Sequence, residues 1–189
     1  VAANSDLNQV LGTIEHDYLF AITWLRLLPP EVLKLPAKLA INIHGGPLPR
    51  YAGLNSPSWA ILAQEPDFGV TWHVMTPGAD EGDVLRQVTF PIAQHETALS
   101  LSTKCFTEAV DAFDVLIQDL ENDALEPQSQ DLSQRTYFGR HDRPEAACIL
   151  DLNRTASELD ALVRALDFDR NENVLGTPKI LHKDRGVSI

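Results

Sequence analysis

The sequence predicts an α/β protein built on an open, mostly parallel sheet. Two short apolar runs, Tyr18–Thr23 and Leu39–Ile43, are typical of strands that are covered on both faces. Between them Leu28–Glu31 starts a short helix, with proline suited to its first turn, and the glycine- and proline-rich loop His44–Pro49 follows the second run. Strand, helix, strand and loop is the order of an open α/β sheet, in which ligands bind beyond the carboxyl ends of strands.

The next elements are a helix, a strand, a turn and another strand. Asn55 or Ser56 can cap the helix, because both side chains accept backbone hydrogen bonds. Gly69–Thr76 alternates apolar and polar residues, which indicates a strand. Pro77–Asp83 has the composition of a turn, and Val84–Ile92 returns to a strand pattern.

A long amphipathic helix is expected from Thr97 to about Asn122. Its apolar residues recur every three or four positions, which places them on one face of a helix. They are Phe106, Val110, Phe113, Ile117 and Leu120. We expect this helix to cover one face of the sheet.

The domain organisation predicted from composition is a core over residues 1–123, a linker over 124–134 and the start of a small C-terminal module over 135–189. The stretch after residue 123 is acidic and polar, which is typical of a linker. In the second part, Thr155 and Glu158 form a capping box at the start of a helix. About fifty residues are too few for a confident independent core.

Both ends of the chain suggest a fragment. Only seventeen residues precede Tyr18, and they show no strand–loop–helix unit, so we expect the sheet to be N-terminally incomplete. Lys183–Ile189 is interpreted as the turn and first residues of a hairpin that lacks its partner strand. We therefore expect the isolated chain to aggregate or to melt at low temperature, and not to turn over by itself.

Composition narrows the class of partner. The net charge of -12 disfavours generic nucleic-acid binding, which depends on clustered basic residues. No apolar run is long enough to span a membrane and no signal pattern is present, so the default address is the cytoplasm. Cys105 and Cys148 fit neither a disulfide framework nor a metal pair, and small buried residues are the interpretation.

Three residues are candidates for the chemistry. Asn42 and His44 lie two positions apart at a strand end, so both side chains leave the same face. If the turn Pro77–Asp83 lies beside that end, its Asp80 could complete a trio. Acyl transfer to an amine needs donors for the oxygen that becomes negative and a base for the amine proton. No metal is required.

Three ordered blocks give these residues a family context. They are INIHGGPLPRYAG at Ile41–Gly53, GVTWHVM at Gly69–Met75 and GADEGDVL at Gly78–Leu85. Together they resemble the folate-dependent formyltransferase family. The resemblance implies a Rossmann-like formyltransferase core and transfer of a formyl group from 10-formyltetrahydrofolate to an amine. The acceptor would be an aminosugar nucleotide, an aminoacyl carrier or a similar amine, as in the formyltransferase domains of peptide- or polyketide-assembly enzymes.

The same resemblance assigns roles to residues. Asn42 and His44 would contact the formyl oxygen, and Asp80 would steer proton transfer through water. The folate-binding residues that it implies come from the segment before and within the short helix and from the loop that reads the pterin ring. They are Arg26, Leu28, Leu33, Thr76, Gly78 and Ala79.

Some residues depart from the pattern or stay open. Gly46–Pro49 stands where the family commonly has S-L-L-P, so a serine hydroxyl is absent and the amine-side pocket is less defined. Asp83 is interpreted as a solvated turn acid. For His73 two interpretations stay open, a structural histidine, which is favoured, and a residue near the site. Two rival functions remain. One is a hydrolase that passes the formyl group to water with the same trio, and the other is a folate-binding or scaffolding domain without turnover.

Overall fold

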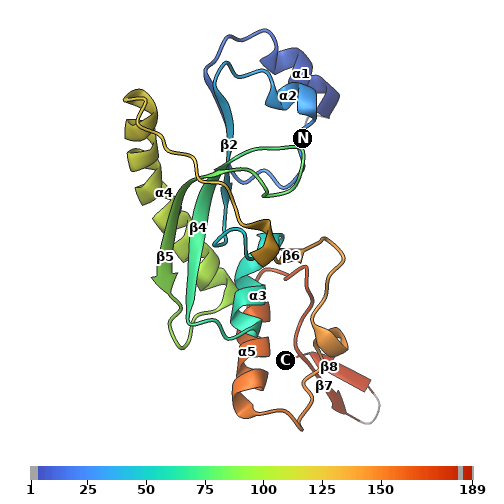
Figure 1. The fold of residues 1–189 in the computed structure, drawn as a ribbon. Coiled ribbons are helices and arrows are strands. Elements are labelled where there is room, and N and C mark those ends of the chain that lie inside the picture. The colour runs from blue at the N-terminus through green and yellow to red at the C-terminus, as the bar shows by residue number, and fades with distance from the viewer. Residues whose placement is uncertain (1–3, 183–184, 189) are drawn as a thin grey trace.

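The computed structural model describes residues 4–182 and 185–188 and has a four-stranded sheet at its centre (Figure 1). The strands lie in the order β1, β2, β4, β5. Their bounds are Tyr18–Ala21 for β1, Leu39–His44 for β2, Asp67–Val74 for β4 and Val84–Pro91 for β5. Helices pack against this sheet, so the α/β class predicted from the sequence is confirmed.

The sheet is mixed, which corrects the expectation of a mostly parallel one for the described strands. β1 runs parallel to β2, but β2 and β4 are antiparallel and so are β4 and β5. The connection between β4 and β5 explains the second pair. Only residues 75–83 separate them, and a parallel pair needs a crossover of about a dozen residues or more. The sequence therefore carried this signal in its strand–turn–strand order.

Helix α4, Ala98–Glu121, covers one face of the sheet as expected, but with a different stripe of residues. It begins at a capping box formed by Thr97 and Ser100. Phe106 and Val110 are more than half exposed, whereas small residues face the sheet. The buried positions are Ala98, Leu101, Cys105, Ala109, Ala112, Leu116 and Leu120. Small side chains let the helix approach closely, and the indole N–H of Trp72 reaches the carbonyl of Ala109 at 3.2 Å.

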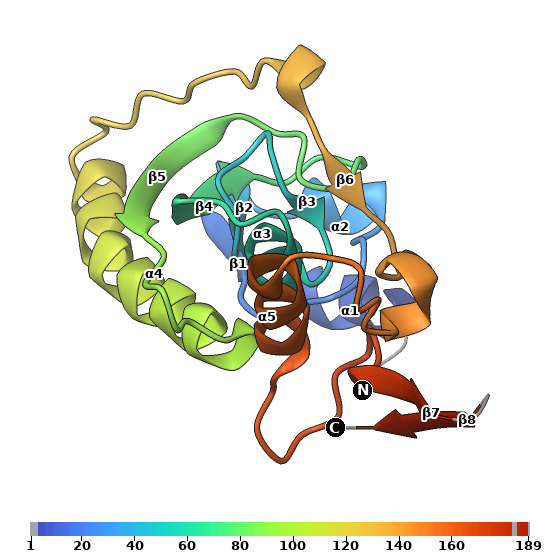
Figure 2. The ribbon, with the colours of Figure 1, turned by 90° about the horizontal axis from the view of Figure 1, so that it is seen from below.

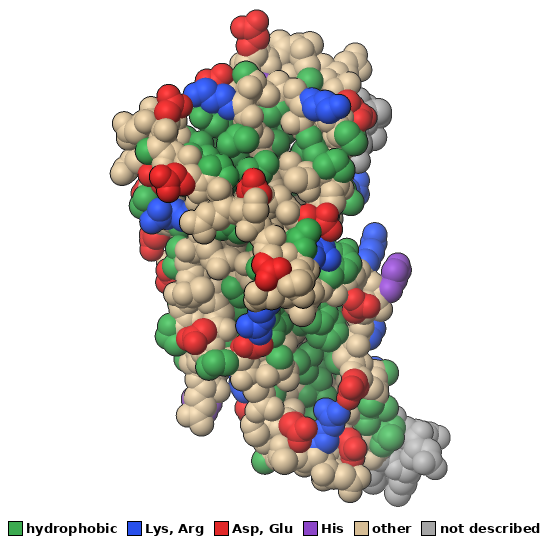
Figure 3. Space-filling model, viewed as in Figure 1, with side chains coloured by type: hydrophobic (Ala, Val, Ile, Leu, Met, Phe, Trp, Pro, Cys, Tyr) green, Lys and Arg blue, Asp and Glu red, His purple; other side chains and the backbone are tan. Residues whose placement is uncertain are grey.

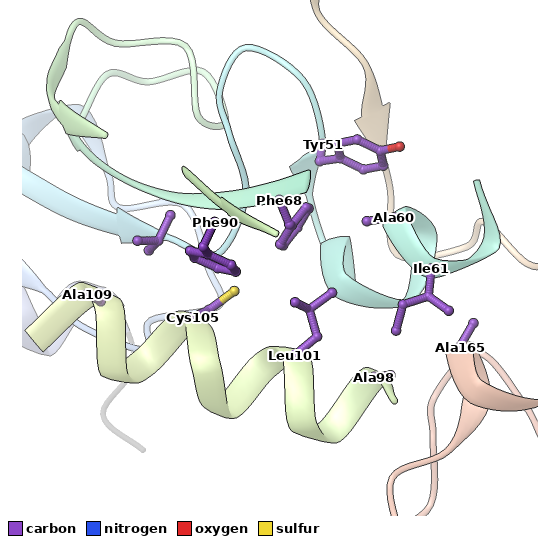
Figure 4. Packing of buried hydrophobic residues seen from close by; sticks show 11 residues of the cluster. Tyr51, Ala60, Ile61, Phe68, Phe90, Ala98, Leu101, Cys105, Ala109 and Ala165 are labelled. Atoms are coloured by element: carbon purple, nitrogen blue, oxygen red, sulfur yellow. The ribbon is translucent and has the colours of Figure 1, made fainter. Parts of the chain in front are cut away.

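The main core lies between α4, the sheet and the short helix α3, Ser56–Leu62 (Figure 4). Phe68 and Phe90 from adjacent strands meet Leu101 of α4 there. Both cysteines are buried and free, as predicted. Asn55 occupies the N-cap of α3, but its side chain makes no capping hydrogen bond because its backbone is left-handed (φ 57°). The cap position was predicted correctly and its mechanism was not.

The chain after α4 returns to the core rather than leaving it. Strand β6, Tyr137–Phe138, pairs in parallel with the short strand β3, Ala52–Gly53. Helix α5, Ala156–Leu166, packs beside α3, and its Ala165 belongs to the main core cluster. The predicted capping box at Thr155 is confirmed. Two 3-10 turns, Leu132–Gln134 and Glu145–Cys148, complete this region (Figure 2).

Two helices and one hairpin complete the described elements. Helix α1 spans Asn4–Leu11 and α2 spans Pro30–Leu33. Strand β7, Lys179–His182, pairs with β8, Arg185–Ser188. The expectation of a hairpin without a partner was therefore wrong: the partner strand is β7, which precedes the turn, and Lys183, Asp184 and Ile189 lie outside the described residues.

The molecular surface carries scattered charges. On the face in Figure 3, Lys and Arg side chains stand singly among Asp and Glu. Near the β1 edge several apolar side chains are more than half exposed, among them Ile22, Leu25 and Leu27. No helix of the described residues is long and apolar enough to cross a membrane. The cytoplasmic address stays a prediction.

Candidate active site

The register between β2 and β4 gathers polar side chains on one sheet face. Asn42 lies opposite His73, and His44 lies opposite Thr71. Because side chains two positions apart share a face, these four residues point to the same side. His44, Thr71 and His73 are buried. A strand register that pairs two predicted site residues with a second histidine builds a polar cluster in the interior.

Asp80 completes the cluster from the turn between β4 and β5. One carboxylate oxygen lies 3.5 Å from Nδ1 of His44 and the other lies 3.4 Å from Nε2 of His73. The backbone N–H of Gly53 donates to the same carboxylate at 2.8 Å. The Asp80 side chain is only 14% exposed. The structure thus brings Asn42, His44 and Asp80 together, and places His73 among them.

Hydrogen bonds fix the tautomers of both histidines. Nε2 of His44 lies 2.7 Å from the carbonyl of Tyr51, and because a carbonyl only accepts, this nitrogen carries a proton. Nδ1 of His73 lies 2.9 Å from the carbonyl of Val74 and carries a proton for the same reason. Nε2 of a neutral His73 is therefore an acceptor, and the amide of Asn42 donates to it at 3.1 Å.

Burial and charge set the ionisation of the cluster. Burial alone would raise the pKa of Asp80, but the imidazole of His73, the charge of His44 and the amide of Gly53 together lower it to about 2. Burial lowers the pKa of His44 below its usual value, against the raising influence of Asp80. Near neutral pH the site therefore holds an ionised Asp80 beside a neutral His44.

A cavity of about 500 Å³ opens beside this cluster. Asn42, His44, His73 and Asp80 all line it. The other lining segments are residues 23–28, 53–58, 75–76 and 78–79, with parts of α4 and the residues Tyr137 and Phe168. Cys105 also lines it, but burial raises the pKa of its thiol to about 12, so it is not a ready nucleophile.

The predicted folate-binding residues divide in two groups. Arg26, Leu28, Thr76, Gly78 and Ala79 all line the cavity. Leu33 does not line it. This residue is half-buried on the one-turn helix α2, whose fully buried side chain is Val32.

Other residues at the site have the roles that the sequence could not give. His73 was interpreted as structural, but the structure puts it against both Asn42 and Asp80. The strand register could have revealed the position of His73. Thr71 lies opposite His44, and His73 lies two positions after Thr71, so its side chain is on the same face. Trp24 lines the cavity, and its indole N–H is buried with no hydrogen-bond partner among the described residues. Asp83 accepts from the hydroxyl of Ser129 at 3.0 Å and lies outside the cluster.

Comparison with known proteins gives the cluster a family. A family model described as formyl transferase matches residues 1–116, which is more than half of the chain. The chain belongs to the formyl transferase family. The resemblance read from the three sequence blocks is thereby confirmed, and the chain is a formyltransferase by class.

Solved formyltransferase structures share the fold. A 4-N formyltransferase from Francisella tularensis is similar with a TM-score of 0.83 and 23% identity over 100% of this chain and 75% of that one. An N-formyltransferase from Helicobacter canadensis has a TM-score of 0.75 and 26% identity over 87% and 58% of the two chains. WlaRD, a sugar 3N-formyl transferase, has a TM-score of 0.72 and 27% identity over 82% and 57%. This chain therefore spans less than two thirds of the latter two.

Proposed function

We propose that this chain transfers the formyl group of 10-formyltetrahydrofolate to the amine of a nucleotide-linked aminosugar. The Helicobacter canadensis structure is a complex with folinic acid and dTDP-3-aminofucose, and the WlaRD structure contains dTDP and 5-N-formyl-THF. The observation that carries the proposal is the convergence of Asn42, His44 and Asp80 on one cavity.

The pair of Asp80 and His44 suits removal of the amine proton. Transfer of a formyl group takes one proton from the attacking nitrogen and returns one to the nitrogen that leaves. Nδ1 of a neutral His44 is a free base that faces the carboxylate of Asp80 at 3.5 Å. A proton held at Nδ1 would be stabilised by that negative charge. We assign proton transfer to this pair, with the low pKa of Asp80 keeping its charge in place.

Asn42 suits stabilisation of the formyl oxygen as it becomes negative. Its amide nitrogen has two protons, and one of them is donated to His73. The second is free to donate toward the cavity. The N–H of His44 is already donated to the carbonyl of Tyr51. The geometry therefore favours Asn42 over His44 as the donor to the oxyanion, whereas the sequence assigned both residues to that oxygen.

The cavity is compatible with a folate donor, which supplies the formyl group when bound. Apolar residues such as Leu28 and Met75 offer apolar surface for a ring system, and the polar cluster lies on the same cavity. The buried indole N–H of Trp24 has no partner among the described residues and needs an acceptor, which polar atoms of such a ligand could supply. Arg26 is exposed on the lining and could meet a carboxylate. We assign Arg26, Leu28, Thr76, Gly78 and Ala79 to the donor.

The test is formyl transfer to a panel of amines by the purified protein that contains this chain. The panel holds two nucleotide-linked aminosugars that differ in the position of the amine, an aminoacyl carrier, and a reaction without amine. Tetrahydrofolate release and the mass of the formylated product are measured together. We expect the formylated aminosugar.

Each other result identifies a rival. Tetrahydrofolate released equally without amine would mean a hydrolase. Formyl product only with the aminoacyl carrier would change the acceptor class. Donor binding without any turnover would favour the scaffolding role.

A further inference from the structure

Residues 128–136, here called the strap, lie along the turn that carries Asp80. In Figure 2 the chain that leaves α4 crosses beside β5 before it enters β6. Gln128 exchanges two backbone hydrogen bonds with Val84 at 2.8 Å each. The amide of Gln130 then donates to the carbonyls of Asp80 at 3.0 Å and Gly82 at 2.6 Å. The segment assigned to a linker from its composition is therefore bound to the site.

Arg135 continues the same set of contacts. Its guanidinium donates to the carbonyl of Ala79 at 2.8 Å and lies 3.5 Å from the carboxylate of Glu81. The guanidinium also lies over the ring of Tyr137, with 4.8 Å to the centroid. Together with Gln130, it engages the backbone carbonyls of three residues in a stretch of four. All three are inside the turn that positions the catalytic carboxylate.

The backbone of Asp80 needs such support. Its φ of 55° is left-handed, a region that costs a residue other than glycine about 1 kcal/mol. Strained backbone persists when its surroundings determine it from several sides. Gly82 cannot carry a side chain, because a Cβ would come 1.9 Å from the carbonyl of Val74. The turn is thus close-packed on one side and hydrogen-bonded by the strap on the other.

The strap also determines what the carboxylate of Asp80 contacts. At the end of the strap, the carbonyl of Thr136 accepts from the N–H of Ala52 at 3.0 Å. The hydroxyl of Thr136 accepts from the backbone N–H of Tyr51 at 2.7 Å. These bonds hold β3 so that the N–H of Gly53 faces Asp80 at 2.8 Å. Backbone and side chain of Asp80 are therefore both fixed through one segment.

We propose that the strap is a positioning element, in which Gln130 and Arg135 hold the carboxylate of Asp80 toward His44 and His73. This inference deepens the proposed function and rests on it for its kinetic part. Neither Gln130 nor Arg135 is assigned to either substrate. They act through Asp80, by fixing the carbonyls that flank it.

The test compares Gln130→Met with Gln134→Met. Methionine keeps most of the volume of glutamine and removes its donors. Gln134 is a matched control, because it lies in the strap but, among the described residues, its side chain bonds only the exposed Asp131. We expect Gln130→Met to lower kcat about 10- to 100-fold, as misplacement of a catalytic group does, with the KM of the folate donor within about twofold. Gln134→Met should match the parent chain in both constants.

Amide hydrogen exchange at Gly53 gives a readout independent of activity. Its N–H is donated to the Asp80 carboxylate, so displacement of the carboxylate should speed exchange in Gln130→Met and not in Gln134→Met. Unchanged kcat in an active, folded Gln130→Met variant would overturn the inference. So would unchanged exchange. If the parent chain transfers no formyl group, the proposed function fails, and the exchange experiment alone decides the placement of Asp80.

A second variant keeps the inference testable if Gln130→Met does not fold. Arg135→Met removes the donor to Ala79 without touching Gln130. It should show the same pattern of lower kcat, steady donor KM and faster exchange at Gly53. If neither variant folds, the strap is a folding element and the inference is overturned.

Discussion

Two walls of the cavity are built in opposite ways. The turn 75–83 is fixed by hydrogen bonds from the strap and from β3, and the carboxylate of its Asp80 is largely buried. The segment 23–28 lies on the same cavity, yet it makes no backbone hydrogen bond with the rest of the described chain. Most of its side chains are exposed. One wall is fixed by several hydrogen bonds, whereas the other makes no backbone hydrogen bond with the rest of the described chain.

The difference separates two tasks. Charge that develops during a reaction is stabilised best by groups that are already in place, because they need no reorganisation. Binding of a flat apolar ligand needs mainly surface, which a loosely held segment can offer. Substitutions in the polar cluster, at Asp80 or Asn42, should therefore lower kcat, whereas those in the segment 23–28 should raise the KM of the donor. Each prediction below tests that division.

The largest effect is expected at Asp80. Asp80→Asn removes the charge beside His44 and should lower kcat by about 10²- to 10⁴-fold, the range for a general acid–base group. Asp83→Asn is the matched control, since that carboxylate lies outside the cavity lining and accepts from the hydroxyl of Ser129. We expect little change there. Steady-state kinetics on both variants decide the point, and equal losses would mean that the acid role is misassigned.

Removal of the oxyanion donor should cost less. Asn42→Ala deletes the amide that can donate to the formyl oxygen, and we expect kcat to fall about 100-fold. Donor affinity, measured by folate titration, should stay nearly unchanged. Loss of folate binding would instead assign Asn42 to donor binding. It would also contradict the division between residues for catalysis and residues for binding.

The residues of the polar cluster were easier to predict from the sequence than the contacts that hold them in place. Asn42, His44 and Asp80 were found from strand periodicity, turn composition and a family resemblance, since all three signals are local. Most of the strap lies in the segment 124–134, which its composition predicts to be a linker. Its contacts join residues about 50 positions apart, and polar composition does not reveal a long-range partner.

Packing gave the other failures. The buried stripe of α4 could not be read from its large apolar residues. The small Cys105 and Ala109 face the sheet, and the larger Phe106 does not. Likewise His73 looked structural until the register of β2 and β4 put it opposite Asn42. Contacts of this kind depend on tertiary geometry that a single sequence does not show.

The ionisation of Asp80 should appear in the pH dependence of stability. Its pKa is about 2 in the folded chain against 3.8 as the ordinary value, so the folded state favours the charged form. This contribution is complete above pH 3.8 and is lost as the pH falls toward 2. Its size is about 2 kcal/mol. Urea unfolding of the parent chain and of Asp80→Asn should therefore give free energies of unfolding that converge over this range.

The lowered pKa of His44 also makes the folded chain less stable as the pH falls, but over a higher pH range than that of Asp80. The unfolded chain binds the imidazole proton more readily below about pH 6.5, so stability falls as the pH drops through that value. His44→Gln should remove this slope and weaken the one below pH 3.8, because the charge of His44 contributes to the low pKa of Asp80. If the two slopes do not separate, His44 and Asp80 titrate as one unit in the folded chain.

The smallest effect is expected at Trp24, in the segment 23–28. Trp24→Phe keeps an aromatic ring but removes the buried indole N–H that has no partner among the described residues. If the folate donor accepts that hydrogen bond, its KM should rise about fivefold, close to 1 kcal/mol, with kcat unchanged. Trp59 offers a matched control. Its indole N–H is also buried without a described partner, but the ring stacks on Phe138 at 4.6 Å and does not line the cavity. Trp59→Phe should leave both constants unchanged, and a fall in kcat with Trp24→Phe would show that the loosely held wall also shapes the reaction.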